Sequence, residues 1–276
     1  MMLKGKKVLI MGIRNKWSIA WGAAQAAHEQ GAEVIFTYSS MESEEKLKNL
    51  ISEIPNSKMY PCDVDEDSKI EEVFKTIKKN HGNIDGILHS IAHANTEDLR
   101  NDFITTSREG FSHANDISAY SLVAICRYAK EMLNPGASIV SLTYMGSEKV
   151  MPNYNVMGVA KAALECSIRY LASSLGKDGI RVNAVSAGPI KTLSAKGIQN
   201  FGSMMSIVEE KSALKRNVSA YEVGNVVAFL MSNMSSSVTG QSLWCWRTPV
   251  LERWRSMMPF SQSTSLTFRS LMSVWP

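Results

Sequence analysis

The stretch KVLIMGIRNKWSIAWGAAQAAHEQGAEVIFTY, residues 7–38, decides the fold class. It opens with an apolar run of strand length, continues with an amphipathic segment over residues 18–30, and ends with a second apolar run over 32–38. Two strands joined by a helical crossover lie parallel in one sheet, and the crossover is right-handed in nearly all proteins. The stretch therefore predicts the first strand–helix–strand unit of a parallel sheet.

The same alternation continues along the chain. Further strand-like runs lie at 58–64, 85–94, 137–144 and 180–188, and helical periodicity recurs near 42–54, 66–79, 108–133 and after Asn153. Strands that are apolar along their whole length are covered by helices on both faces of the sheet. We therefore expect an α/β fold, a Rossmann-like doubly wound parallel sheet flanked by helices on both faces, as a single domain over residues 1–241.

Composition and charge exclude several classes of function. The formal net charge is +4, and the four arginines and one glutamate after residue 241 account for +3 of it, which leaves a nearly neutral body. A neutral body argues against nucleic acid as a partner, and no apolar run approaches the roughly 18 residues of a membrane span. The cysteines show no CxxC pair, which favours reduced thiols in a cytoplasmic protein without a metal site. They are Cys62, Cys126, Cys166 and Cys245.

The loop after the first strand is placed to bind a pyrophosphate. The N-terminus of the following helix offers unpaired N–H groups and the positive end of the helix dipole. The usual GxGxxG pattern is absent, and only Gly12 and Gly22 remain, with Ser18 near the helix start. A tight turn with a serine N-cap is the alternative, and this segment alone does not separate the two interpretations.

The ends of the next strands bear on the choice of cofactor. No lysine or arginine occurs from Thr37 to Glu45, so nothing in that segment would neutralise the 2′-phosphate of NADPH. This favours NADH. Asp63 ends the third strand, where it could bond adenine or cap the next helix. His89 and His93 fall near the end of the fourth strand, where a core or loop role is expected in preference to a metal pair.

Two tyrosines and a lysine are the candidate catalytic residues. Tyr154 and Lys161 are seven residues apart, so on one helix they face the same way, because seven steps of about 100° make nearly two turns. A lysine near a phenol favours the phenolate and can also hold a nicotinamide ribose. Tyr144 ends the preceding strand and faces the same crevice. A solvated lysine beside two half-buried tyrosines is the alternative, and the spacing alone does not exclude it.

Small residues surround Lys161 and permit close backbone approach, which we expect to be to another subunit. They are Gly158, Ala160, Ala162 and Ala163.

Six collinear segments resemble the bacterial NADH-dependent enoyl-(acyl carrier protein) reductases, which are divergent short-chain dehydrogenase/reductases. The resemblance runs from about Lys4 to Gln241, and the Tyr-x6-Lys spacing separates this family from ordinary members, which use Tyr-x3-Lys. The segments are SIAWG (18–22), HANDISAYS (113–121), MLNPGASIVSLTY (132–144), YNVMGVAKAALE (154–165), RVNAVSAGPIKTLSAKGI (181–198) and EVGNVVAFLMS (222–232).

The resemblance implies an activity and a role for each matching residue. The activity is NADH-dependent reduction of the trans-2 double bond of an enoyl chain on acyl carrier protein, the last step of the type II fatty acid elongation cycle. Tyr154 would stabilise the enolate, Tyr144 would shape the pocket, Lys161 would bind the nicotinamide ribose, and Ala94 would border the acyl group. The implied cofactor residues are Gly12, Ser18, Ile19, Ser39, Asp63, Val64, Ser90, Ile91, Lys161, Ile190, Lys191, Thr192, Leu193 and Ser194.

The family also implies a homotetramer and binding of diphenyl ether inhibitors of the triclosan type. The family often has Gly-Phe where this chain has Ala92-His93, so the pocket wall differs here. Residues 192–210 mix Gly, Ser and Met with apolar side chains, which predicts a mobile flap, with an ordinary surface helix as the alternative.

Two other functions stay open. One is a carbonyl reductase of the same superfamily, which would carry Tyr-x3-Lys and an upstream catalytic serine, and neither is seen. The other is a non-catalytic, NAD-sensing Rossmann protein, a class that generally lacks the Tyr/Lys pair.

The chain departs from the family pattern after residue 241. Four of the six tryptophans lie past Gly240, and the Val-Asp-x-Gly element of the family is missing. We expect an atypical C-terminal tail over 242–276, a frameshifted or foreign end, in which SLWCW (242–246) could still pair as an edge strand. Residues beyond about 248 are not expected to pack regularly, because Pro249 removes a ladder donor and the tail exposes too much aromatic surface.

Overall fold

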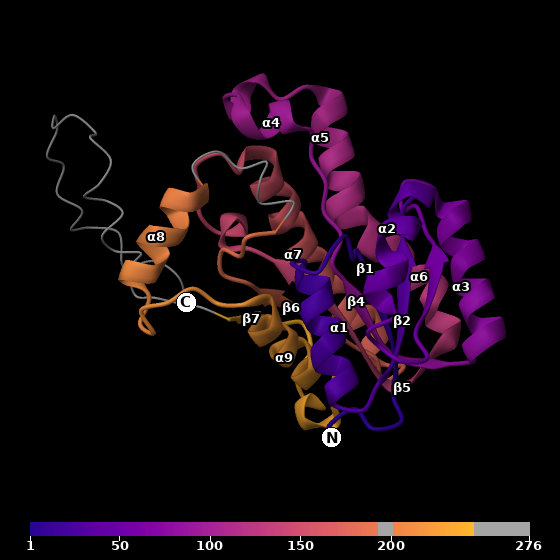
Figure 1. The fold of residues 1–276 in the computed structure, drawn as a ribbon. Helices are drawn as coiled ribbons and strands as arrows, with labels where there is room; N and C mark the ends of the chain where they lie inside the picture. Colours follow the sequence, from indigo (N-terminus) through magenta and orange to yellow (C-terminus); the bar gives the residue numbers. More distant parts are fainter. Residues whose placement is uncertain (193–200, 246–276) are drawn as a thin grey trace, which may run out of the picture.

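The computed structural model describes residues 1–192 and 201–245. Within those ranges seven parallel strands form one sheet in the order β3-β2-β1-β4-β5-β6-β7 (Figure 1). The expected doubly wound parallel sheet is thereby confirmed. The strands are β1 Lys7–Met11, β2 Glu33–Tyr38, β3 Lys58–Pro61, β4 Ile84–His89, β5 Leu133–Thr143, β6 Arg181–Ser186 and β7 Ser242–Trp244.

The helices follow the predicted alternation closely. The expected long helix over 108–133 is present, but a π-helical turn at Asp116–Tyr120 separates its halves, α5 and α6. The pattern missed α4 and did not place α9. The helices are α1 Ile19–Glu29, α2 Met41–Ile51, α3 Asp67–His81, α4 Thr96–Arg100, α5 Arg108–Asn115, α6 Ser121–Ala129, α7 Asn155–Gly176, α8 Phe201–Lys211 and α9 Ala220–Met231.

A hydrophobic core lies on each face of the sheet. In one core, α1, α2 and α9 pack against one face of the sheet. In the other core, α3, α6 and α7 pack against the opposite face (Figure 1). Alternate residues of each strand supply the two cores, as in Leu9 and Ile10 of β1. Both faces of the central strands are covered, which is why β1, β4 and the second half of β5 are almost wholly buried.

Close helix packing explains Gly22. A Cβ atom on Gly22 would lie 2.4 Å from the carbonyl carbon of Ala220, and one on Gly224 would lie 2.4 Å from the carbonyl oxygen of Gly22. The two glycines therefore allow α1 and α9 to cross almost backbone to backbone. Gly22 acts in helix packing and does not belong to the loop that follows β1.

The strand order reverses between β1 and β4. The chain builds β2 and β3 outward from one side of β1 and β4 to β7 outward from the other, so a crevice opens at the carboxyl ends of β1 and β4. Ligands bind at such switch points in open α/β sheets. Met11 and His89, the last residues of these two strands, lie side by side there.

The C-terminal strand confirms one expectation for the tail. Ser242–Trp244 pairs in parallel register with Ala184–Ser186, so the start of SLWCW does form an edge strand. The residues expected not to pack, beyond about 248, lie outside the described ranges. So do residues 193–200 of the expected flap, whereas 201–211 form α8. Among the described helices, none is both long and apolar enough to cross a membrane.

Candidate active site

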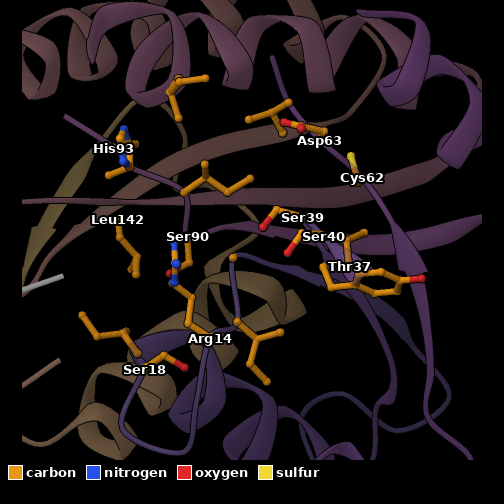
Figure 2. Close-up of a pocket in the computed structure, with 18 of the residues that line it drawn as sticks. Arg14, Ser18, Thr37, Ser39, Ser40, Cys62, Asp63, Ser90, His93 and Leu142 are labelled. Carbon is orange, nitrogen blue, oxygen red and sulfur yellow. The ribbon is translucent and has the colours of Figure 1, made fainter. Parts of the chain in front are cut away.

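A cavity of about 490 Å³ lies at the crevice between β1 and β4 (Figure 2). This volume falls in the range of small-molecule sites, roughly 300–1,000 Å³. Its walls come from the loop after β1, from the ends of β2, β3 and β4, and from α7. Among the predicted residues, it brings together Gly12, Ser18, Ile19, Ser39, Asp63, Val64, Ser90, Ile91, Lys161 and Thr192.

Gly12 allows the loop after β1 to approach β4. Its φ is +89°, and a Cβ atom there would lie 2.0 Å from the carbonyl oxygen of Ser90. Any side chain at position 12 would therefore push the two strand ends apart. Both the backbone conformation and the space require glycine.

The N-terminus of α1 is open toward the cavity. Ser18 is the N-cap residue, but its hydroxyl donates to the carbonyl oxygen of Asn15 at 2.6 Å and accepts no hydrogen bond from the helix. The first N–H groups of α1 thus keep their capacity to bind an anion. Ser18 thus holds the N-cap position that the alternative interpretation gave it, but its side chain leaves the start of the helix uncapped.

Asp63 lies in the cavity wall. Its carboxylate accepts from the backbone N–H of Asp65 at 3.3 Å, and the N-cap of α3 is Glu66. The helix-cap alternative for Asp63 is therefore wrong. Its neighbour Val64 lines the same wall.

Lys161 is buried, with a relative exposure of only 6%. Its ammonium donates to the carbonyl oxygen of Leu142, the second-last residue of β5, at 2.8 Å. Burial lowers the pKa of Lys161 from its usual 10.5 to about 8, while the nearby carboxylate of Glu165 acts in the opposite direction. The alternative of a solvated surface lysine is thus wrong, and a charged nitrogen lies at the cavity wall.

Tyr144 and Tyr154 lie against each other, edge to face, with ring centroids 5.0 Å apart. Tyr144 directly follows β5 and Tyr154 is the N-cap residue of α7, so the helix begins just after the tyrosine. Both are half-buried, and neither is part of the cavity wall that holds Lys161. The two tyrosines form a separate pair, on the turn after β5 and at the start of the helix that carries Lys161.

The phenols are protonated at neutral pH. Burial raises the pKa of Tyr144 to about 12, and burial, with the added effects of Tyr144 and Glu165, raises the pKa of Tyr154 well above its ordinary value. The expectation that Lys161 would favour a phenolate at Tyr154 is therefore wrong. Tyr154 is a hydrogen-bond donor, which suits it to an oxyanion.

Two glycines hold Tyr154 in place. A Cβ atom on Gly146 would lie 2.4 Å from the ring of Tyr154, and one on Gly158 would lie 2.8 Å from the carbonyl oxygen of Gly146. The close approach at Gly158 is therefore made within the chain, to the backbone of Gly146. The expected approach of another subunit near Lys161 stays a prediction. Ala160 is likewise buried in the chain, whereas Ala162 is exposed.

Sequence comparison names the family. The family model described as enoyl-(acyl carrier protein) reductase matches residues 12–245. The chain belongs to this family. The enoyl-(acyl carrier protein) reductase (NADH) of Bacillus subtilis is 50% identical over 243 residues, 87% of this chain and 94% of the relative. The NADPH enzyme of Staphylococcus aureus strain MRSA252 is also 50% identical over 243 residues, 87% of this chain and 95% of the relative.

Solved structures agree with this assignment. The Bacillus cereus enoyl-acyl carrier protein reductase, in complex with NADP+ and indole naphthyridinone, superposes with a TM-score of 0.88 at 46% identity. The match covers 91% of this reductase and 98% of the B. cereus chain. The recognition from sequence is thus confirmed, and so is the fold.

Several predicted residues of the reductase lie off the cavity wall. Ala94 is half-buried, Ile190 packs against the core under α1 and α9, and Lys191 is exposed. None of the three lines the cavity, whereas Thr192 does. Leu193 and Ser194 lie outside the described residues.

Sequence reasoning missed Arg14. We sought a base only between Thr37 and Glu45, but Arg14 comes from the loop after β1, and Figure 2 shows its guanidinium reaching toward Ser90 in the cavity. A base inside the loop GIRNKWS, which the sequence predicted to bind a pyrophosphate, was the signal that could have found it. Ala92 and His93, which the sequence placed at the pocket wall, line the cavity, and other cavity residues not predicted include Asn15, Ser40, Asp65, His113 and Leu142.

The histidines near the fourth strand have different roles. His89 is fully buried, its two ring nitrogens hydrogen-bond Ser141 and Ser121 at 2.9 and 2.8 Å, and burial lowers its pKa to about 3. Its expected core role is confirmed. His93 lies at the cavity wall, where its Nδ1 is 2.9 Å from Nε2 of His113. In the described part of the chain, no group of three or more His, Cys, Asp or Glu residues could hold a metal ion.

Proposed function

We propose that this reductase uses NADH to reduce the trans-2 double bond of an enoyl chain carried on acyl carrier protein, as the last step of the type II elongation cycle. The observation that carries the proposal is that Tyr154 and Lys161 both belong to helix α7. Tyr154 caps α7, and Lys161, seven residues along that helix, lies in the wall of a nucleotide-sized cavity. Tyr154 as proton donor and Lys161 as the cation for the cofactor would thus be held by one helix.

The residues present fit a dinucleotide. The open N-terminus of α1 with Ser18 and Ile19 would hold the pyrophosphate, and Asp63 with Val64 would contact adenine. Ser39 would take the adenosine ribose, and Lys161 the nicotinamide ribose. Ser90 and Ile91 would border the nicotinamide, over which the segment 190–194 would close. NADH supplies the hydride that reaches the β-carbon of the substrate.

The residues of the chain would stabilise the negative charge that develops on the substrate when it is reduced. When the β-carbon gains a hydride, the electron pair of the C=C bond forms a double bond between the α-carbon and the carbonyl carbon, and the carbonyl pair moves to the thioester oxygen, which gives an enolate. The Tyr154 phenol, whose pKa is raised, would donate a hydrogen bond to that oxygen. A proton then adds to the α-carbon. Tyr144 would fix the Tyr154 ring and shape the acyl pocket, which Ala94 borders.

NADH is proposed as the preferred cofactor. The end of β2 presents Ser39 and Ser40 to the cavity, followed by the acidic Glu42 and Glu44 of α2. None of these four side chains would neutralise a 2′-phosphate. Relatives at similar identity are named for NADH in B. subtilis and for NADPH in S. aureus, so family membership alone does not select between the two.

The remaining proposals concern assembly and ligands. We infer a cytoplasmic homotetramer, and size-exclusion chromatography with light scattering would test its mass. Diphenyl ethers of the triclosan type are expected to bind beside Tyr154, since the B. cereus relative binds indole naphthyridinone. The domain is taken to span residues 1–241, followed by the atypical tail over 242–276.

One assay separates the three functions under consideration. NADH oxidation is followed at 340 nm with crotonyl thioester and, in parallel, with a β-ketoacyl thioester. An enoyl reductase consumes NADH with the crotonyl substrate and leaves the ketoacyl substrate unchanged. The reverse preference would identify a carbonyl reductase, and NADH binding without turnover of either substrate would identify a nucleotide sensor.

A further inference from the structure

Glu165 lies one helical turn beyond Lys161 on α7 and belongs to none of the sites described above. Its Oε1 atom accepts hydrogen bonds from the Thr143 hydroxyl at 2.5 Å and from the Ser147 hydroxyl at 2.6 Å. Thr143 is the last residue of β5, and Ser147 ends the short 3-10 turn Met145–Ser147. The two hydroxyls therefore lie on either side of the turn that carries Tyr144.

The same carboxylate anchors this turn to the helix that carries Lys161. The Ser147 hydroxyl, which has a single hydrogen, also lies 2.9 Å from the carbonyl oxygen of Tyr144, so it shares that hydrogen between the turn and Glu165 of α7. A half-buried carboxylate that accepts two hydroxyl donors is well satisfied and geometrically fixed. Rotation of the turn would break both bonds to Glu165.

Glu165 also sets the charge balance around Lys161. The titratable groups that interact with the lysine are His89 from β4 and Glu165 from its own helix, and the phenols of Tyr144 and Tyr154 lie on the adjoining turn and at the start of that helix. His89 is neutral at physiological pH and the two phenols are protonated. Glu165 is thus the anion that favours the charged lysine, and its negative charge opposes the loss of the proton that burial promotes.

We propose that Glu165 is a positioning residue for the reaction, which anchors the Tyr144 turn through Thr143 and Ser147 and keeps Lys161 charged for the cofactor ribose. The inference rests on the proposed function, because it assigns Lys161 to a bound nucleotide. It does not make Glu165 a contact of the substrate or of the cofactor.

The two roles can be separated by substitution. Glu165→Gln keeps an oxygen at the Oε1 position, so both hydroxyl bonds can persist, but it removes the charge. The double substitution Thr143→Val with Ser147→Ala removes both bonds and keeps the charge. Glu148→Gln is the matched control, since Glu148 is exposed at the end of the same turn.

The main measurement is the dissociation constant of NADH as a function of pH, from tryptophan fluorescence without substrate. In the parent, NADH affinity falls as the pH rises past the pKa of Lys161, because the ammonium loses its charge. Removing the negative charge lowers that pKa, so Glu165→Gln moves the midpoint of the fall to lower pH by about half a unit or more. The Thr143/Ser147 double variant and Glu148→Gln leave the midpoint in place.

Turnover of crotonyl thioester supplies the second readout. The double variant lowers kcat several-fold with NADH affinity unchanged, because the Tyr144 turn is released. A Glu165→Gln midpoint equal to that of the parent would overturn the charge role, and an unchanged kcat in the double variant would overturn the anchoring role. If the parent binds NADH but turns over no enoyl thioester, the proposed function fails while the pH shift still tests Glu165.

Discussion

The ring of Tyr154 packs edge to face with the ring of Tyr144 and closely approaches Gly146. The two aromatic planes meet at 66° with centroids 5.0 Å apart, and a Cβ atom on Gly146 would be 2.4 Å from the Tyr154 ring. The tyrosines are ten residues apart in sequence, and the short turn after β5 brings them together. Edge-to-face pairs of this kind are worth about 0.5–1.5 kcal/mol beyond their burial. The orientation of the Tyr154 hydroxyl is therefore fixed before any ligand binds.

Tyr154→Phe is expected to remove catalysis while leaving the cofactor site intact. Phenylalanine keeps the edge-to-face contact with Tyr144 and loses the hydroxyl, so kcat should fall on the order of 100-fold or more. Steady-state kinetics with crotonyl thioester measures the loss, and NADH affinity should change less than about two-fold. Tyr144→Phe is the comparison and should cost less. Parental activity in Tyr154→Phe would move the oxyanion role elsewhere, with Tyr144 next in line.

Gly146→Ala is expected to reduce turnover without touching a polar group. The added methyl group would collide with the Tyr154 ring and displace its hydroxyl. Gly176→Ala is the control, because a Cβ atom at the end of α7 meets nothing within 4 Å. The control should fold with equal or slightly higher stability, by up to about 1 kcal/mol. Equal kcat in the two variants would show that the Tyr154 position is not critical.

Lys161→Met is expected to raise stability and to weaken NADH binding. Burial of the charged lysine, which lowers its pKa from 10.5 to about 8, destabilises the folded parent by roughly 3 kcal/mol at neutral pH, and the methionine variant is spared this destabilisation. Part of this gain is offset by the lost bond to Leu142, so the free energy of unfolding should rise by about 1–3 kcal/mol. Urea unfolding and NADH titration measure the two effects.

The difference in free energy of unfolding between the parent and Lys161→Met is expected to depend on pH. Between about pH 8 and pH 10.5 the unfolded parent holds a proton on Lys161 that the folded parent has lost, so the parent gains stability as the pH rises. The methionine variant has no such gain. The difference in stability between the two should therefore narrow above about pH 8, and a difference that stays constant up to pH 10 would contradict a buried charge at this site.

NADH is expected to be used in preference to NADPH at matched concentrations. Ser39 and Ser40 offer no positive charge at the end of β2, and Ser40→Lys should improve the kcat/KM for NADPH relative to NADH.

Arg14→Ala probes the base that comes from the loop after β1. A loss of affinity that is equal for NADH and NADPH would place Arg14 on the pyrophosphate. A loss confined to NADPH would place it on the 2′-phosphate and would contradict our cofactor assignment from the β2 segment.

Cutting the chain after Trp246 is expected to leave the cofactor site intact. The predicted cofactor and catalytic residues all precede Gly240, and β7 ends at Trp244. The truncated protein should bind NADH as the full chain does and should stay soluble at higher concentration. Loss of folding on truncation, with a well-behaved full chain, would show that residues 247–276 are a structural element and that the frameshift interpretation is wrong.

Local pattern predicted most of the fold. Strands that are apolar along their length and helices of regular period are properties of neighbouring residues, so 7–38 alone indicated a parallel sheet, and the six collinear segments indicated the reductase family. The π-helical turn at Asp116–Tyr120 and the short α4 escaped detection, because a single turn of helix leaves little periodic signal. The close crossing at Gly22 and Gly224 also escaped, since the two residues are about two hundred positions apart.

The sequence by itself determined the sheet, the crevice at its switch point, and the residues Tyr144, Tyr154 and Lys161 as candidates. Only the tertiary structure decided their chemical states. The burial of Lys161 and of the phenols depends on which segments cover them, and the pKa values of these groups follow from that burial. The same holds for Arg14 and Glu165, whose neighbours come from other parts of the chain. Charge and solvation depend on distance in space, which the order of residues along a chain does not give.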